Sequence, residues 1–324
     1  MPSQSLPKLP RHIAAVGTFD GVHRGHQAVV GYLVAQGKAR GLAPAVVTFS
    51  SHPLAVVRPE RVPKSLCSVE QRTARLREAG VDDVILLTFD ETLRQLTARD
   101  FIAMLHDRYG VDAIVLGFNN SFGSDRLKDF DDYVRAAAES DVEILPAPRY
   151  DHLGFGGDVS STAIRHLIAS GDVDSAARLL GHPVTLSGEV VGGKRLGRTI
   201  GFPTANLQVD SSCAVPAEGV YACRAFVGVD GSGCDVDATQ HPCVPAMVNI
   251  GRRPTVDTSA DPLVTIEAHL IGFDGDLYGS VISLEFVQRI RDERRFDSLE
   301  ALIAQLEADR MATEEIIGQC SPLA

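Results

Sequence analysis

The hydrophobic pattern of the chain changes near residue 183, and this change limits the folds that the chain can adopt. Before this point, short apolar runs alternate with segments of helical periodicity. The apolar runs are Ile13 to Val16, Ala45 to Phe49, Val84 to Leu87 and Ala113 to Leu116. Strands that alternate with helices are typical of a parallel sheet covered on both faces. We therefore expect an α/β domain over residues 1–182, closed by two short helices, the second of which ends at Gly181.

Beyond Pro183 the apolar residues follow a period of two. Apolar side chains at 264, 266, 268 and 270 alternate with Thr265, Glu267 and His269, and a similar alternation runs from 282 to 286. Such runs, separated by Gly- and Pro-rich turns, indicate an antiparallel barrel or sandwich. One amphipathic helix follows, with Ser298 as its candidate N-cap. We assign residues 183–324 to a second, β-rich domain that ends in this helix.

The composition is that of a globular protein with an acidic surface. Hydrophobic residues make up 44% of the 324 residues and charged residues 23%. The 31 Lys and Arg against 42 Asp and Glu give a formal net charge of −11. Because nucleic acids and anionic membranes both require a basic face, we expect neither as a partner. A few local cations and backbone amides can still hold a small phosphorylated ligand.

The sequence predicts a cytoplasmic location. Residues 1–10 lack the apolar segment of a secretory signal, and the longest uncharged stretch, residues 41–57, is interrupted by prolines and polar residues. The six cysteines form no C-x-x-C pair and have no metal-like spacing, so we expect reduced thiols. They are Cys67, Cys213, Cys223, Cys234, Cys243 and Cys320.

The strongest local motif follows the first apolar run, where residues 17–26 read G-T-F-D-G-V-H-R-G-H. A strand that enters a glycine turn and then a helix presents backbone N–H groups and the positive end of the helix dipole to an anion. His23 and His26 are three residues apart, so on a helix they would share one face near the first turn. Two imidazoles beside a polyphosphate can stabilise charge that develops during displacement. Taken without the turn, the pair could equally be two solvated side chains.

This motif, in its longer form F-D-G-V-H-x-G-H-Q over residues 19–27, resembles the H-x-G-H nucleotidyltransferase superfamily. Its flavin-specific branch is the N-terminal domain of the bifunctional riboflavin kinase/FAD synthetase family. Residues 48–53 are similar to the T-F-x-P-H-P segment of that family, with Ser51 where proline is usual. Residues 117–123 resemble its G-x-[DN]-x-x-F-G loop, although the glycine that usually follows is not evident in 124–129. The resemblance implies nucleotide contacts at Gly17, Phe19, Asp20, Gly21 and Asn119.

Residues 159–165, V-S-S-T-A-I-R, match the S-S-T-x-I-R motif of the same family. The pattern predicts a helix start, because Ser or Thr caps the free N–H groups of the first turn. An ordinary cap is the alternative interpretation, but an arginine in the first turn opposes the helix dipole unless an anion neutralises it. The resemblance implies triphosphate contacts from Ser160, Ser161, Thr162 and Arg165. The implied reaction is attack of a phosphate oxygen on the α-phosphorus of ATP, with pyrophosphate leaving.

The second half contains one misleading motif. Residues 188–194 fit the start of a P-loop, G-x-x-x-x-G-K. The next residue should be Ser or Thr to reach magnesium, but it is Arg195, and the surroundings have β character. We therefore reject a P-loop at this position.

The more informative motif is G-R-T-I-G-F-P-T-A-N over residues 197–206. In an extended segment, Thr204 and Asn206 point the same way, and a hydroxyl and an amide oxygen are hard ligands that suit Mg²⁺. A plain turn is the alternative for P-T-A-N alone. The full string resembles the G-R-x-x-G-F-P-T-A-N signature of riboflavin kinases, which implies nucleotide binding by this segment and Mg²⁺ binding by Thr204 and Asn206. The nucleotide-binding residues implied are Gly197, Arg198, Gly201, Pro203, Thr204 and Asn206.

Three further stretches, residues 219–222, 248–255 and 266–269, agree with the kinase resemblance. From the alternation alone, Glu267 could be a solvated strand carboxylate. The family's E-x-H strand carries the catalytic glutamate, which corresponds to Glu267, and its implied role is to accept the proton of the ribityl hydroxyl of riboflavin. Residues 291–296 resemble a family segment near the flavin, although a solvated charge run explains them nearly as well.

The resemblance therefore implies a Rossmann-like nucleotidyltransferase domain followed by an antiparallel β-barrel kinase domain. The implied activity is phosphorylation of riboflavin with MgATP to give FMN, followed by adenylylation of FMN to give FAD, with His23, His26 and Glu267 as catalytic residues. Small molecules are then the expected partners, and a homo-oligomer is compatible with the sequence. Two alternatives remain at this level: nucleotide transfer to another phosphorylated acceptor, and a flavin-binding module without activity.

Overall fold

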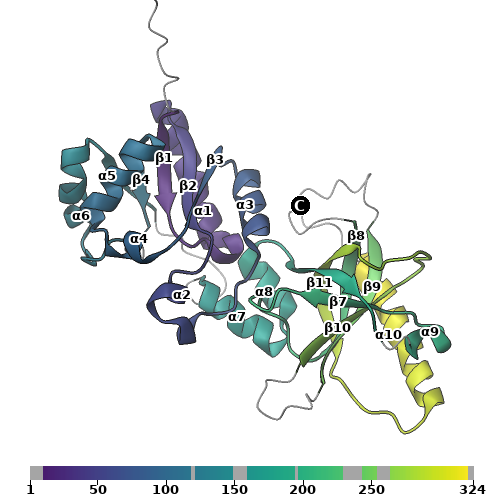
Figure 1. The fold of residues 1–324 in the computed structure, drawn as a ribbon. Coiled ribbons are helices and arrows are strands. Elements are labelled where there is room, and N and C mark those ends of the chain that lie inside the picture. The colour runs from purple at the N-terminus through teal and green to yellow at the C-terminus, as the bar shows by residue number, and fades with distance from the viewer. Residues whose placement is uncertain are drawn as a thin grey trace, which may run out of the picture. The chain divides into compact units, whose positions relative to one another are not determined.

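The computed structural model describes residues 10–117, 121–148, 159–193, 196–228, 243–253 and 263–319. The chain divides into two compact units (Figure 1). The first contains Met1–Pro63 and Arg72–Asp158, and the second contains Lys64–Gln71 and Val159–Ala324. The two short helices that were expected to close the domain of residues 1–182 therefore belong to the second unit.

The first unit is built on a parallel sheet of five strands in the order β3-β2-β1-β4-β5. Its strands are β1 (His12–Val16), β2 (Ala43–Phe49), β3 (Asp83–Leu87), β4 (Val111–Leu116) and β5 (Glu143–Pro146). The chain leaves β1 toward β2 and later returns to its other side as β4. This reversal of strand order creates the crevice at the carboxyl ends of β1 and β4 where open α/β sheets bind ligands.

Helices cover both faces of this sheet, as the sequence predicted. The helices are α1 (Arg24–Arg40), α2 (Leu54–Val57), α3 (Val69–Glu78), α4 (Glu91–Gln95), α5 (Ala98–Tyr109) and α6 (Phe130–Ala137), with 3-10 turns at Asp20–Val22, Pro59–Arg61 and Ala138–Ser140. Alternate residues of β1 enter different cores. Ile13 and Ala15 belong to the apolar cluster that contains side chains of α1 and α3, whereas Ala14 and Val16 pack with those of α5 and α6. The alternation follows from the period of two along a strand.

The second unit contains a closed antiparallel barrel of six strands in the order β10-β7-β6-β11-β8-β9. The strands are β6 (Val184–Val191), β7 (Ala205–Val209), β8 (Gly219–Val227), β9 (Val244–Arg253), β10 (Leu263–Leu270) and β11 (Val281–Arg291). The helices are α7 (Ser161–Ser170), α8 (Val173–Leu180), α9 (Leu196–Thr199) and α10 (Leu299–Gln319). The barrel predicted from the resemblance is confirmed, whereas α9 was not predicted.

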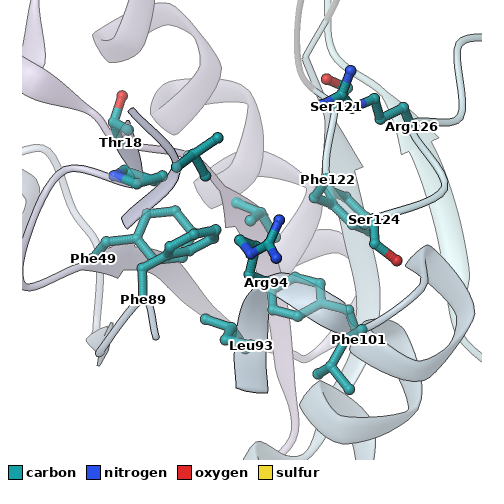
Figure 2. A pocket seen from close by; sticks show the side chains of 16 residues that line it. Thr18, Phe49, Phe89, Leu93, Arg94, Phe101, Ser121, Phe122, Ser124 and Arg126 are labelled. Carbon is teal, nitrogen blue, oxygen red and sulfur yellow. The ribbon is translucent and has the colours of Figure 1, made fainter. Parts of the chain in front are cut away.

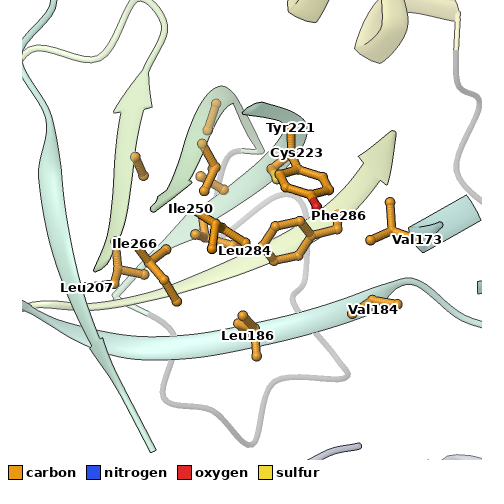
Figure 3. Packing of buried hydrophobic residues seen from close by; sticks show 14 of the residues in the cluster. Val173, Val184, Leu186, Leu207, Tyr221, Cys223, Ile250, Ile266, Leu284 and Phe286 are labelled. Atoms are coloured by element: carbon orange, nitrogen blue, oxygen red, sulfur yellow. The ribbon is translucent and has the colours of Figure 1, made fainter. Parts of the chain in front are cut away.

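Side chains fill the interior of the barrel (Figure 3). Tyr221 and Phe286 are both fully buried and meet edge to face, with ring centroids 5.4 Å apart. Val173 of α8 belongs to the same cluster, so this helix closes one side of the core. The barrel is therefore a packed core, and its chemistry has to be carried on the outside.

Helix α10 packs on the outer surface of the barrel. Ser298 caps it, because its hydroxyl accepts a hydrogen bond from the N–H of Ala301 at 3.1 Å, as the sequence predicted. Arg291 of β11 forms a bidentate ion pair with Asp309 of α10, with contacts of 2.7 to 3.1 Å. Asp309 is only 1% exposed, so this pair is a buried anchor between helix and barrel.

In the part of the chain that the structure describes, Cys67, Cys213, Cys223 and Cys243 form no disulfide bond. Cys234 and Cys320 lie outside the described residues. No helix among the described residues is long and apolar enough to span a bilayer.

Candidate active sites

The turn between β1 and α1 has an unusual backbone. Three of the four residues from 19 to 22 have a left-handed backbone: Phe19 has φ 48°, Gly21 has φ 76° and Val22 has φ 42°. A positive φ is unfavourable for a β-branched residue such as Val22, and it persists only where the surroundings enforce it. Here the N–H of Val22 donates to the carbonyl of Phe19 at 3.0 Å, and Gln27 Nε2 donates to the carbonyl of Val22 at 2.9 Å. Strained backbone is thus held at the predicted phosphate site.

The two histidines of the motif are stacked, with ring centroids 3.7 Å apart. His23 is the N-cap of α1 and has an extended backbone, so of the two histidines only His26 lies within the helix. Its Nδ1 accepts a hydrogen bond from the N–H of His26 at 3.3 Å, which satisfies one of the free donors of the helix start. The pair is nevertheless adjacent at the positive end of the helix.

The pKa of His26 lies well below its usual value of 6.5, first because burial disfavours the charged ring and second because of the nearby His23. Its Nδ1 is buried without a hydrogen-bond partner among the described residues. A neutral imidazole that has one unpaired ring nitrogen can form a hydrogen bond with an oxygen atom of a ligand.

A cavity of about 360 Å³ opens at the carboxyl end of this sheet (Figure 2). Gly17 and Thr18, which precede the strained turn, form part of its wall, and four phenylalanines give it an aromatic lining. These are Phe49, Phe89, Phe101 and Phe122. Aromatic walls combined with several polar groups suit a flat heteroaromatic ligand.

Two side chains from outside the motif hold the cavity wall in place. Arg72 donates to the carbonyl of Thr18 at 2.8 Å and to that of Phe49 at 2.6 Å, and Thr48 Oγ1 donates to Thr18 at 3.1 Å. Arg72 could not be predicted from the sequence, because an arginine on a helix carries no local signal for a carbonyl 54 residues away.

Arg94 places a cation in the aromatic cavity, and its guanidinium lies among the phenylalanine side chains in Figure 2. Its Nε and Nη2 donate to Glu91 at 2.7 and 2.6 Å, and Gln95 Nε2 donates to the same carboxylate at 2.9 Å. The hydrogen bond from Arg94, followed by that from Gln95, lowers the pKa of Glu91 to about 2. The carboxylate therefore stays charged and fixes the orientation of the guanidinium.

Of the other residues predicted for nucleotide transfer, three lie in the same turn as the histidines. Asn119 is outside the described residues. Asp20 and Gly21 are buried in the turn, and Phe19 contacts His26 with a centroid distance of 5.0 Å.

Ser160, Ser161, Thr162 and Arg165 belong to the second unit. Ser160 caps α7, since its hydroxyl accepts from the N–H of Ala163 at 3.2 Å, and this confirms the predicted helix start. Arg165 Nε donates to the carbonyl of Lys64 at 2.6 Å, and Thr162 is exposed. Their contact with a triphosphate stays a prediction.

On the barrel, strand register brings the predicted kinase residues together. Glu267 of β10 is paired with Asn206 of β7 on one side and with Asn249 of β9 on the other. Directly opposed residues of antiparallel strands project from the same face. Because Ala205 and Ile266 are buried in the barrel core, their neighbours Asn206 and Glu267 face outward. Asn249 was not among the predicted site residues, although it lies within the stretch 248–255 that resembles the kinase family.

Asn206, Glu267 and Asn249 form a row on the barrel surface, and glycines allow the backbone to approach it closely. A Cβ atom on Gly193 would collide with the side-chain amide of Asn206, and one on Gly197 would collide with the carbonyl of Phe202. The carbonyl of Gly197 accepts from the N–H of Phe202 at 2.8 Å, and Gly201 has φ 86°. These contacts fold residues 197–202 into a tight turn that requires glycine.

A small hollow of about 70 Å³ lies beside this turn. Arg198, Pro203 and Thr204 line it, together with Asp276 and Tyr278. Predicted nucleotide-binding and metal-binding residues thus meet at one place on the barrel surface.

The donor set fits a magnesium ion that is shared with nucleotide phosphates. Among the described residues, no group of three or more His, Cys, Asp or Glu side chains could hold a metal ion. A hydroxyl and an amide oxygen, from Thr204 and Asn206, are hard but neutral ligands, which leaves the remaining positions to phosphate oxygens and water.

The chain matches the FAD synthetase family over residues 6–163 and the riboflavin kinase family over residues 180–317. Among curated proteins, the bifunctional riboflavin kinase/FMN adenylyltransferase of Pseudomonas fluorescens is 37% identical over 311 residues, which cover 95% of this chain and 94% of that protein. The Escherichia coli K12 protein of the same name is 37% identical, with 98% and 97% covered, and that of Bacillus subtilis is 33% identical, with 93% and 90% covered. The chain belongs to the bifunctional riboflavin kinase/FMN adenylyltransferase family.

A solved structure extends this similarity. The crystal structure of the macrolide-efflux protein from Streptococcus pneumoniae has a TM-score of 0.82 and 31% identity, and the match covers 96% of this chain and 95% of that one. Its name describes the pneumococcal protein, whereas the family of this chain is shown by the matches above.

The sequence-based predictions of fold class, family and two-step flavin cofactor synthesis are therefore confirmed. As a member of the bifunctional family, the chain is an enzyme with kinase and nucleotidyltransferase activity. The roles of single residues, the functional boundary at 182/183 and the magnesium ligands stay predictions.

Proposed function

We propose that the two reactions of flavin cofactor synthesis take place at two separate residue sets, one in each functional domain, 1–182 and 183–324. The barrel domain phosphorylates riboflavin to FMN, and the domain of residues 1–182 transfers the adenylyl group of a second ATP to FMN. The observation that carries the proposal is the register that pairs Glu267 with Asn206, two residues after Thr204.

In the kinase step, Glu267 accepts the proton of the terminal ribityl hydroxyl of riboflavin. The oxygen attacks the γ-phosphorus of ATP, the new P–O bond forms, and the bond to the β–γ bridging oxygen breaks to release ADP. The turn at Gly197, Arg198, Gly201 and Pro203 presents backbone groups and a cation to the phosphates. Thr204 and Asn206 would hold Mg²⁺, which supplies charge neutralisation of the phosphates when bound.

In the adenylylation step, the phosphate oxygen of FMN attacks the α-phosphorus of ATP, and pyrophosphate leaves. No protein nucleophile is required, so the chain contributes positioning and charge stabilisation. His23 and His26 donate to phosphate oxygens at the start of α1, where the helix dipole adds to their effect. The proposed nucleotide contacts are Gly17, Phe19, Asp20, Gly21, Asn119, Ser160, Ser161, Thr162 and Arg165.

The aromatic cavity of the first unit is the proposed binding place for the flavin ring of FMN. Its four phenylalanines supply apolar faces, and Arg94 supplies a donor for the carbonyl oxygens of the ring. An edge with several acceptors is the part of a flavin that a fixed guanidinium can recognise.

The test is to follow riboflavin, FMN and FAD by chromatography after mixing each variant with riboflavin, ATP and Mg²⁺. Glu267→Ala should abolish FMN formation yet still adenylylate supplied FMN, and His23→Ala should do the reverse. Glu189→Ala, which removes an exposed carboxylate from the same barrel, is the matched control and should retain both steps. If either of the first two changes eliminated both activities in folded protein, separate sites would be the wrong description.

The remaining predictions concern the binding partners, the cellular location and the oligomeric state of the enzyme. Small-molecule partners (riboflavin, FMN and ATP) follow from the activity. The absence of a nucleic-acid or membrane partner rests on the net charge of −11, and the cytoplasmic location and a homo-oligomer stay sequence-level expectations.

A further inference from the structure

His269 lies two residues after Glu267 on β10, so the two side chains leave the same face of the strand. His269 is only 8% exposed. Its Nδ1 lies 2.8 Å from the carbonyl oxygen of Pro203, and because a carbonyl only accepts, Nδ1 is the donor. The ring also packs against Phe202, with centroids 5.3 Å apart.

The hydrogen bond from His269 holds the chain directly before Thr204, one of the proposed Mg²⁺ ligands. Proline has no N–H, so the carbonyl is the only backbone group through which Pro203 can be held. Strand β7 begins only at Ala205, where ladder pairing with β10 starts and continues through the Asn206–Glu267 pair. Thr204 therefore lies between two attachments to β10: the bond from His269 just before it and the ladder just after it.

We infer that His269 is a positioning residue for the kinase step. By holding the Pro203 carbonyl, it fixes the Thr204 hydroxyl relative to Glu267, the proposed base on the same strand. This inference rests on the proposed roles of Thr204 and Glu267. Because small displacements of groups that position reacting atoms cost large factors in rate, one hydrogen bond at this point has a catalytic effect beyond its effect on stability.

A purely structural role would instead depend on the ring that packs on Phe202. Two substitutions separate the ring from the donor. His269→Asn removes the ring but keeps an N–H donor at nearly the position of Nδ1, since both nitrogens are bonded to Cγ. His269→Phe keeps an aromatic ring against Phe202 and removes the donor.

The experiment measures riboflavin phosphorylation by the full chain as a function of Mg²⁺ and ATP concentration. We expect His269→Phe to raise the Mg²⁺ concentration for half-maximal activity and the KM for ATP about tenfold, the scale of one buried hydrogen bond, with the KM for riboflavin unchanged. His269→Asn should stay within about threefold of the parent, because the donor is retained. Thermal unfolding of each variant reports whether it folds, and if His269→Phe does not, His269→Ala takes its place in the comparison with His269→Asn.

The outcomes distinguish this inference from the proposed function. If His269→Asn is as impaired as His269→Phe, or if neither changes the Mg²⁺ and ATP dependence, His269 is only a packing residue. Thr204→Ala is measured in parallel. If it raises the Mg²⁺ requirement while His269→Phe does not, the inference alone fails. If Thr204→Ala leaves the requirement unchanged, the assignment of Thr204 fails and the inference fails with it.

Discussion

Arg94 places a cation beside the phenylalanines of the aromatic cavity, and Glu91 fixes its direction through two hydrogen bonds. Two such bonds leave the guanidinium oriented before any ligand arrives. An oriented donor loses little conformational freedom on binding, so its contribution to affinity is larger than that of a flexible lysine.

We therefore predict that Arg94→Met raises the KM for FMN in the adenylylation step about tenfold or more, since a hydrogen bond to a charged group is lost. Riboflavin phosphorylation should be unchanged. Arg99→Met, which removes an exposed arginine of α5, is the control and should leave both steps unaffected. An unaltered KM for FMN in Arg94→Met would place the flavin ring outside this cavity.

The lowered pKa of His26 predicts how stability changes with pH. The unfolded chain binds a proton at this ring near its usual pKa of about 6.5, whereas the folded chain does not until the pH is much lower. Stability from this group is thus fully present above about pH 6.5 and is lost as the pH falls below it. Thermal unfolding between about pH 7.5 and 5.5 should show a decline that is shallower in His26→Gln. An equal decline in both proteins would mean that the buried ring is not the cause.

At the scale of elements, the ion pair of Arg291 with Asp309 links α10 to the barrel. Removal of one partner leaves a charge buried without compensation, which typically costs about 3 to 5 kcal/mol. We predict a loss near the lower end of this range for Arg291→Met, because Gln305 Nε2 still donates to Asp309 at 2.6 Å. Urea unfolding of the full chain measures it.

The double change Arg291→Met and Asp309→Leu should recover part of this stability, since no unpaired charge remains. It also tests the sequence-based expectation that residues 291–296 lie near the flavin. A raised KM for riboflavin in the stable double variant would support that expectation, and an unchanged KM would leave Arg291 with its structural role alone.

The elements themselves were largely predictable from the sequence. Short apolar runs gave β1 to β4 because buried parallel strands require continuous apolar residues, and Ser160, Gly181 and Ser298 marked helix ends by their capping chemistry. What could not be predicted depends on contacts between distant residues. A period of two shows which face Glu267 occupies, but not that Asn206, sixty-one positions earlier, pairs with it. For the same reason, the aromatic cavity of the first unit was missed: Phe49 ends one apolar run and Phe122 belongs to a loop, and nothing in the sequence shows that the two line one cavity.

At the scale of the whole molecule, two separate sites predict that the steps can be divided between molecules. An equimolar mixture of Glu267→Ala and His23→Ala should convert riboflavin to FAD, because FMN released by the second variant is adenylylated by the first. FMN should accumulate before FAD appears when flavins are followed by chromatography. If each variant kept its remaining activity and the mixture nevertheless produced no FAD, FMN would have to pass between sites of one chain without release.

The packed interior of the barrel has a further consequence. Buried side chains such as Tyr221 and Phe286 pack the interior of the barrel. Asn206, Glu267 and Asn249 form a row across three neighbouring strands on its outer surface. The size of the substrate that binds at this row is therefore set by the surrounding loops and not by the diameter of the barrel. Substrate range and thermal stability of the kinase domain can therefore be altered independently, the first by changing loops and the second by changing the core.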